Sequence, residues 1–342
     1  LSSIAIRPQA RFAIQSGHPW VMRDSIVVPA APIATGTAVQ LIEANGDVLG
    51  LGLHNPHSRI AVRTYSRLPS EKLNADFFVD RLQRALQLRL AAPIASKVHA
   101  HSAVRLVFSE GDLLSGLIVD RYGDYLVIQQ TAAALTPVLP DLTAYLIDRL
   151  QPLGILHIID EATAKLEGMN AKEEWVFGSP PPGTIDIDDQ GIRLAIDLQL
   201  GQKTGYYIDQ RDNRSAASAW IAKGASVLDV CCYVGGFGLR IAKDDSSRQV
   251  LGIDSSQTAL AAAQQNAQRN GLTNIRFQQG DFLQSLDALL ADGKSFDAVI
   301  LDPPKLAGSR DSVDRALRAY HRLNFAAVKL LRPGGILVTC SC

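Results

Sequence analysis

The sequence has little cysteine and no long apolar run. Only four of its 342 residues are cysteine, and none has metal-ligand spacing, which argues against a disulfide framework and for a reducing, cytoplasmic compartment. No apolar stretch reaches the ~18–20 residues that cross a bilayer, and the first residues do not form a secretory signal. The length predicts two or three globular domains. Because the chain starts at Leu1, we expect a fragment or a lost start.

Net charge is also absent, but the charges are unevenly distributed. The formal net charge is zero, whereas residues 1–70 hold six arginines and three acidic residues. This arginine excess suits phosphate contacts and equally suits an ordinary solvated face.

The chain divides into three segments. Residues 1–68 alternate apolar and polar side chains around an Asn-Gly-Asp turn, "TAVQLIEANGDVLGLGLHN", which predicts a small β-barrel-like module. Residues 69–183 combine amphipathic helices with apolar strands and are expected to be α+β. The Pro-rich stretch "GSPPPGT" marks the boundary before residues 184–342.

The last segment alternates strands with helices. Its strands are "SVLDV", "QVLGID", "IRFQQGD", "FDAVILD" and "GGILVTCSC". This alternation predicts an α/β fold with a doubly wound parallel sheet, in which ligands bind beyond the carboxyl ends of the strands.

Glycines and acids follow the first three strands of that sheet. Gly235, Gly236 and Gly238 permit a tight turn at a helix N-terminus, but their spacing is not that of a dinucleotide fingerprint. Asp254 ends the second strand, where a carboxylate can accept both ribose hydroxyls. Asp281 ends the third, where it can accept from an adenine amino group.

The aromatic ring of Phe282 would pack on that adenine. The alternative for each acid is a helix N-cap. Taken together, the glycine turn and the two acids fit S-adenosylmethionine better than NAD, because a cofactor without a pyrophosphate needs no phosphate fingerprint.

Two further strands end in polar motifs. Asp302 opens the rigid "DPPK" loop after strand four, which is also compatible with a simple turn. In "TCSC", Cys342 is expected in the ligand layer and Cys340 one layer deeper, as a small buried residue. Cys231 and Cys232 suit the same buried role.

A thiol beside an acid suits methylation of cytosine at carbon 5. A thiolate that adds to carbon 6 makes carbon 5 nucleophilic, a general acid at N3 favours the addition, and a base later removes the C5 proton. Cys342 is the candidate nucleophile and Asp302 the candidate for the N3 contact.

Several ordered motifs carry a family resemblance: "GQKTGYYIDQRDNR", "YVGGF", "IDSSQTAL", "LDPPK" and "TCSC". Together they resemble bacterial class I S-adenosylmethionine-dependent 23S rRNA methyltransferases of the cytosine-C5 type. "SGHPWVMRDSI" with "GLGLHNPHSRIAVR" resembles that family's RNA-binding PUA module, and "GDLLSGLIVDRYGDYLV" its central domain. The likeness covers nearly the whole chain and implies a Rossmann-like methyltransferase domain at residues 184–342.

The resemblance also implies site residues and a partner. Cys342 would be the nucleophile, and the substrate would be 23S rRNA or a large-subunit precursor. The implied cofactor contacts are Tyr233, Gly235, Gly236, Phe237, Asp254, Asp281 and Asp302. Lys203, Asp209 and Arg211 would help to close the pocket, the alternative being a helix start near Asp209. Tyr206 and Tyr207 could stack on a base, but buried packing is the alternative.

The chain departs from the family pattern in two ways. The family sheet continues with two strands after the cysteine motif, so we expect this chain to be truncated. The related two-cysteine enzymes carry a cysteine in the strand-four motif, where this chain has "DPPK", so another group must serve the elimination step.

Two alternative functions stay open, and the oligomeric state, monomer or homodimer, is not determined by the sequence. One alternative is guanine-N7 methylation of rRNA, which needs no thiol. The other is an inactive RNA-binding or assembly factor of the same fold.

Overall fold

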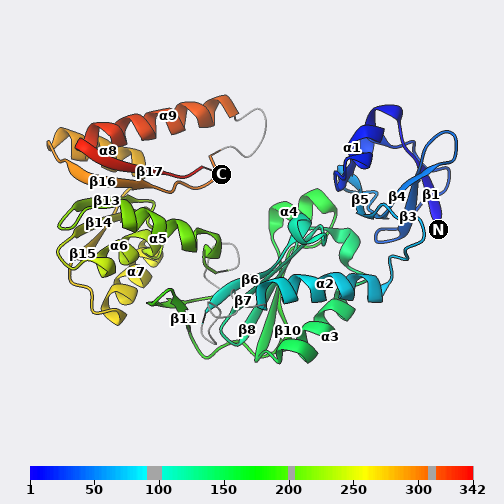
Figure 1. The fold of residues 1–342 in the computed structure, drawn as a ribbon, viewed down its shortest axis with the longest axis horizontal. Coiled ribbons are helices and arrows are strands. Elements are labelled where there is room, and N and C mark those ends of the chain that lie inside the picture. The colour runs from blue at the N-terminus through cyan, green and yellow to red at the C-terminus, as the bar shows by residue number, and fades with distance from the viewer. Residues whose placement is uncertain (91–101, 199–204, 307–312, 342) are drawn as a thin grey trace. The chain divides into compact units, whose positions relative to one another are not determined.

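A computed structural model of the protein describes residues 1–90, 102–198, 205–306 and 313–341 (Figure 1). The chain forms two compact units, residues 1–185 with 197–206, and residues 186–196 with 207–342. The division into three domains at residues 68 and 183 stays a prediction, because the first unit contains both of the first two segments.

The first unit contains two five-stranded sheets. The first sheet has the order β1-β3-β4-β5-β2, and its strands together with α1 are β1 (Ser2–Ala5), α1 (Arg11–Gln15), β2 (Trp20–Met22), β3 (Ala38–Ile42), β4 (Val48–His54) and β5 (Ile60–Ser66). The Asn-Gly-Asp turn joins β3 to β4, as expected for an antiparallel hairpin.

The second sheet of this unit has the order β10-β9-β8-β7-β6. Its elements are α2 (Ala75–Leu90), β6 (Ala103–Phe108), β7 (Leu117–Tyr122), β8 (Tyr125–Gln130), α3 (Leu139–Leu150), β9 (Gly154–Ile159), α4 (Glu161–Glu167) and β10 (Lys172–Gly178). Leu53 and Tyr65 of the first sheet belong to the same buried cluster as Phe78 and Leu82 of α2. The two sheets therefore share a hydrophobic core.

The second unit is a parallel sheet with the order β15-β14-β13-β16-β17. Its strands are β13 (Ser226–Val230), β14 (Gln249–Asp254), β15 (Ile275–Gln279), β16 (Phe296–Leu301) and β17 (Leu331–Thr339), preceded by the hairpin β11 (Ile185–Asp189) and β12 (Ile192–Ile196). Its helices are α5 (Arg211–Trp220), α6 (Gly236–Asp244), α7 (Gln257–Arg269), α8 (Phe282–Ala291) and α9 (Val313–Leu330). This arrangement is the expected Rossmann-like fold.

Alternate residues of the central strands bury opposite faces of this sheet. Leu228 and Val230 of β13 pack in one cluster with Leu286 of α8 and Leu323 of α9. Figure 1 shows α8 and α9 on that side and α5, α6 and α7 on the other. Strands of a doubly wound sheet are covered on both faces, which explains their near-continuous apolar sequence.

The residues predicted to begin and end a helix at residues 256–271 do so for α7. Ser256 caps α7, its side chain accepting from the amide of Ala259 at 3.2 Å, and Gly271 follows with a φ of 65°. Among the described residues, no helix is long and apolar enough to cross a membrane.

Candidate active site

The turn between β13 and α6 has the geometry of a ligand cradle. Gly235 precedes the helix with a φ of 88°, and a Cβ there would lie 3.1 Å from the Leu239 side chain. Cys231 and Tyr233, which are not glycine, also have positive φ, 61° and 51°. Such strained backbone gathers at functional sites. The first amides of α6, those of Gly236 and Phe237, have no partner within the helix and point outward from its N-terminus.

Phe237 itself faces the interior. Its side chain is 4% exposed, and the guanidinium carbon of Arg214 lies 5.8 Å from its ring centroid. Any contact that Phe237 makes with a cofactor would therefore come from its backbone.

Asp254 and Tyr233 are brought together at the end of β14. The Asp254 carboxylate accepts from the Tyr233 amide at 2.8 Å and from the Ser256 amide at 2.9 Å. An ionised carboxylate has about four lone-pair positions, so two further bonds to a ribose remain available. The Tyr233 ring meets Tyr207 edge to face at 5.7 Å.

Asp281 caps α8, the alternative that the sequence left open. Its Oδ1 accepts from the amides of Leu283 and Gln284, both at 3.0 Å. Phe282 packs partly buried against the core cluster of the sheet. The adenine contacts of both residues stay predictions.

Asp302, Gln210 and Cys340 form a cluster at the ends of β16 and β17. The two strands pair in parallel with Leu301 opposite Thr339, and the Cys340 amide donates to the Leu301 carbonyl at 2.8 Å. The Gln210 amide donates to Asp302 at 3.4 Å, and both side chains hydrogen-bond the Cys340 thiol.

Cys340 is half-buried, so the prediction of a fully buried residue is wrong, while its depth relative to Cys342 stays a prediction. β17 ends at Thr339, so Cys340 lies after the strand, half-buried and level with the acid. Burial, with the Asp302 charge next, raises the pKa of Cys340 to about 11, and the thiol is protonated at neutral pH. Cys342 lies outside the described residues.

The acids at the strand ends converge around one thiol. Burial first, and then the carboxylates of Asp254, Asp229, Asp302 and Asp281, raise the pKa of Cys231 to about 12. Burial likewise holds the pKa of Cys232, which is 5% exposed, well above its ordinary value. Both thiols are protonated; Cys232 is buried as predicted, whereas Cys231 is only partly buried, so that prediction is wrong for Cys231. The carboxylates of Asp254, Asp302 and Asp281, with Asp229 partly ionised, create a negative local field.

Asp229 is a site residue that the sequence analysis did not identify. Its side chain is 1% exposed; Oδ2 accepts from the Gly238 amide at 2.8 Å, and Oδ1 has no partner among the described residues. Burial raises the pKa of Asp229 to about 7. The available signal was a carboxylate inside the apolar run "SVLDV", where a charge is costly without a partner.

The predicted site residues before and at the start of α5 differ in their contacts and exposure. Arg211 pairs with Asp189, its Nε 2.8 Å from Oδ1, while Arg214 reaches Oδ2 of the same acid at 2.8 Å. Asp209 is exposed in the short turn Ile208–Gln210 that starts the helix. Tyr206 is 3% exposed, which agrees with buried packing. Lys203 lies outside the described residues.

This donor set fits S-adenosylmethionine. A Cβ at Gly235 would lie 3.1 Å from Leu239. The Asp254 carboxylate at the end of β14 has accepting positions left beyond its two amide partners, and Asp229 has a buried oxygen without a partner among the described residues. The negative field complements the cationic sulfonium and ammonium groups of that cofactor and opposes an anionic pyrophosphate.

Comparisons with known proteins agree with this architecture. A family model described as a PUA-like domain matches residues 4–67, and one described as a methyltransferase domain matches residues 221–342. A putative SAM-dependent methyltransferase from Streptococcus mutans superposes with a TM-score of 0.82 at 19% identity, covering 100% of this chain and 86% of that chain. At that identity the likeness shows the fold alone.

Sequence relatives are more similar. Ribosomal RNA large subunit methyltransferase I of Tolumonas auensis is 35% identical over 328 residues, which are 95% of this chain and 81% of that protein. The protein of the same name from Photobacterium profundum is 35% identical over 333 residues, 96% of this chain and 83% of the relative. This chain therefore belongs to the ribosomal RNA large subunit methyltransferase I family, whose methyltransferase domain uses S-adenosylmethionine.

Proposed function

We propose that the protein transfers a methyl group to carbon 5 of a cytosine in 23S rRNA, with Cys342 as the nucleophile. The relatives' names supply the rRNA substrate class, and this substrate in turn favours a cytoplasmic location and a large-subunit precursor as partner. The observation that supports the C5 chemistry is the register of β16 and β17, which sets Asp302 beside Cys340, two residues before Cys342 in the sequence.

The residues at the strand ends have separate roles in this proposal. The first amides of α6, Asp254 and Asp281 hold the cofactor, and Tyr233 helps to position Asp254. When bound, S-adenosylmethionine supplies an electrophilic methyl group. Lys203, Asp209 and Arg211 are proposed to close the pocket, with Arg211 anchored on Asp189.

The reaction is a covalent addition followed by an elimination. The Cys342 thiolate would form a bond to cytosine carbon 6 while the Asp302 carboxyl, in its protonated form, donates to N3. Carbon 5 would then take the methyl group, and the sulfonium sulfur would keep the electron pair of the broken bond as a neutral thioether. A base takes the C5 proton, the electrons of that bond re-form the 5,6 double bond, and the carbon–sulfur bond breaks. The target base must be unstacked to reach the site.

Trapping with 5-fluorocytosine in a 23S rRNA fragment tests this mechanism. Fluorine at carbon 5 cannot be removed as a proton, so a covalent RNA–protein adduct should accumulate with cofactor present. Cys342→Ser should abolish the adduct and lower kcat by about 10³-fold. Cys340→Ala is the matched control and should still form the adduct, because its thiol is protonated at neutral pH.

Two outcomes would contradict the proposal. Full methylation of guanine by Cys342→Ser would show N7 chemistry without a nucleophile. Absence of cofactor binding by calorimetry would show a non-catalytic RNA-binding factor.

A further inference from the structure

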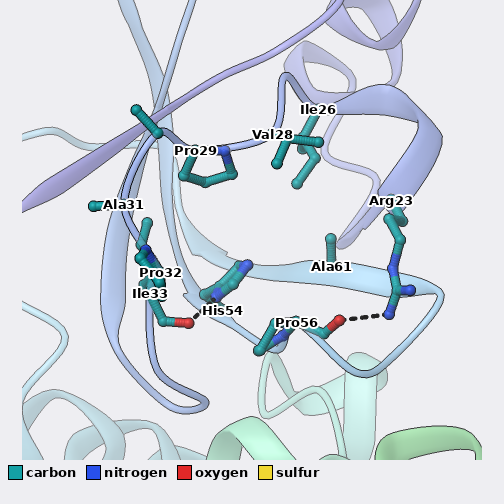
Figure 2. Close-up of a pocket in the computed structure, with 11 residues that line it drawn as sticks. Arg23, Ile26, Val28, Pro29, Ala31, Pro32, Ile33, His54, Pro56 and Ala61 are labelled. Carbon is teal, nitrogen blue, oxygen red and sulfur yellow. Dashed lines mark hydrogen bonds between the residues drawn. The ribbon is translucent and has the colours of Figure 1, made fainter.

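A cavity of about 350 Å³ lies in the PUA-like part of the first unit, whereas the residues assigned to catalysis belong to the second unit (Figure 2). One wall is the Pro-rich segment after the turn Arg23–Ser25, and the other comes from the region of β4 and β5. Most of the lining is aliphatic; the lining residues are Arg23, Ile26, Val28, Pro29, Ala30, Ala31, Pro32, Ile33, His54, Pro56 and Ala61. The volume falls at the lower end of the ~300–1,000 Å³ range of small-ligand sites.

Two polar side chains hold the walls in place. Arg23 Nη2 donates to the carbonyls of Pro56, at 2.6 Å, and Ser58, at 2.9 Å. Nδ1 of His54 lies 3.1 Å from the Ile33 carbonyl, across the cavity from Arg23 in Figure 2. Burial lowers the pKa of His54, so its ring is neutral at neutral pH and donates to that carbonyl. The cavity is thus a preformed structure between segments distant in sequence.

The residues that line the cavity include a positive charge, although the exposed acid Asp24 follows Arg23 in sequence. No acidic side chain is among its lining residues, and Arg23 is exposed beside it. Arg7 Nε donates to the carbonyl of the lining residue Ile26 at 3.3 Å, which places a second guanidinium nearby. The neighbouring acid, Asp24, accepts from the Ser25 hydroxyl at 3.3 Å. An apolar hollow with a cationic rim is complementary to a flat apolar group carrying an anion.

We propose that this cavity binds a single unstacked nucleotide of the rRNA substrate, with the base between the aliphatic walls and its phosphate at Arg23. The inference rests on the proposed function, which makes RNA the substrate. Proteins recognise RNA chiefly through bases splayed out of single-stranded loops, and arginine is well suited to phosphate. A double helix is too wide for such a volume, and an apolar side chain of a protein would leave the cationic rim without a counter-charge.

Two adjacent valines provide a matched test. Val28 lines the cavity and is 81% exposed, whereas Val27 is 51% exposed and is not among the lining residues. Val28→Asp adds a carboxylate at the rim without disturbing the core and should weaken binding of transcribed 23S rRNA about 10-fold at fixed salt. Val27→Asp makes the same charge change one residue away and should alter that affinity by less than about twofold.

A second variant acts by volume instead of charge. Val28→Trp places a large side chain at the same exposed lining position and should fill the cavity and weaken binding to a similar extent. An unchanged urea unfolding transition checks that the first unit, which holds the cavity, is folded in each variant. Photo-cross-linking of the wild-type protein to 4-thiouridine-substituted 23S rRNA should place an adduct within residues 26–33 or 54–61.

The outcomes separate this inference from the proposed function. If the wild-type protein binds 23S rRNA and Val28→Asp binds it as well as Val27→Asp, the nucleotide site is wrong while the methyltransferase proposal stands. Loss of binding only to ribosomal particles, with naked rRNA unaffected, would instead indicate a protein side chain in the cavity and would also overturn the inference. A wild-type protein that binds no 23S rRNA would overturn both.

Discussion

At the scale of single residues, Asp229 shows how one side chain can serve the site at the expense of stability. A carboxylate with 1% exposure and one bonded oxygen is poorly solvated, and the nearby charges of Asp302 and Asp254 add repulsion. A Cβ at Gly238 would lie 3.0 Å from its Oδ2, so glycine is needed there for the close approach of the α6 backbone. Asp229 thereby positions the turn that is proposed to hold the cofactor.

Replacing Asp229 with asparagine should change how stability depends on pH. The pKa of Asp229 is raised to about 7 in the folded state, so the folded protein binds this proton more tightly than the unfolded chain does. The stability that this proton binding contributes is complete below the unfolded pKa and is lost as pH rises through 7. Between pH 5 and pH 8 the wild type should therefore lose about 2 kcal/mol of unfolding free energy relative to Asp229→Asn. Urea denaturation at several pH values measures this difference.

The control for this experiment is an exposed carboxylate of the same unit. Asp314→Asn, in the first turn of α9, should give an unfolding curve parallel to that of the wild type at each pH. A pH-independent difference between wild type and Asp229→Asn would show that the Asp229 carboxyl is ionised throughout.

At the scale of elements, the helices that follow the strands begin at the edge of the sheet where ligands of this fold bind, so helix capping and the proposed cofactor contacts involve the same residues. Asp281 caps α8 through Oδ1, which accepts from two amides, while its second oxygen is not part of the cap. One carboxylate can cap the helix through Oδ1 and leave its second oxygen for the proposed adenine contact, and a substitution can remove one of these roles without the other.

Asp281→Ser should retain the cap and lose the proposed adenine contact. Serine caps helices about as well as aspartate, but its side chain is shorter. The unfolding free energy should stay within about 0.5 kcal/mol of the wild type, while affinity for S-adenosylmethionine falls about fivefold. Asp281→Ala should lose the same affinity and a further ~1 kcal/mol of stability. Calorimetric affinity equal to the wild type in Asp281→Ser would leave Asp281 as a cap alone.

At the scale of the whole molecule, a buried polar cluster joins the two sheets of the first unit. The Glu167 side chain of α4 is 5% exposed and lies 3.0 Å from Arg63 of β5, which is 7% exposed. Its other partners include Asn55 and Ser58, both between β4 and β5, and the amide of Ala133. The ion pair and the hydrogen bonds of this cluster hold the PUA-like sheet and the central sheet in one arrangement.

Glu167→Ala should destabilise the first unit strongly, because it removes the nearer and more buried carboxylate partner of the buried Arg63 guanidinium and leaves it only the longer 3.5 Å contact with Glu110. The expected loss is about 3–5 kcal/mol of unfolding free energy, measured by urea denaturation. Asp80→Ala, which breaks the exposed pair of Asp80 with Arg84, is the control and should cost less than about 1 kcal/mol. Equal small effects of both substitutions would show that the buried cluster does not couple the sheets.

Much of the fold was predictable because its signals are local. The predicted strands "SVLDV" and "QVLGID" coincide with β13 and β14, since buried parallel strands are short apolar runs between turns. Ser256 and Gly271 marked the ends of α7 for equally local reasons. The motif order also identified the family and the positions of Asp254, Asp281 and Asp302 at strand ends.

Tertiary structure alone decided what those residues contact. The sequence contained Asp229, Gln210 and Cys340, but only the pairing of β16 with β17 set the acid beside the thiol, because register depends on residues about forty positions apart. The cavity of the PUA-like part arises in the same way, from a Pro-rich segment and a sheet that meet only after folding. Periodicity and capping act over a few residues and determine elements, whereas a site depends on which distant elements pack together.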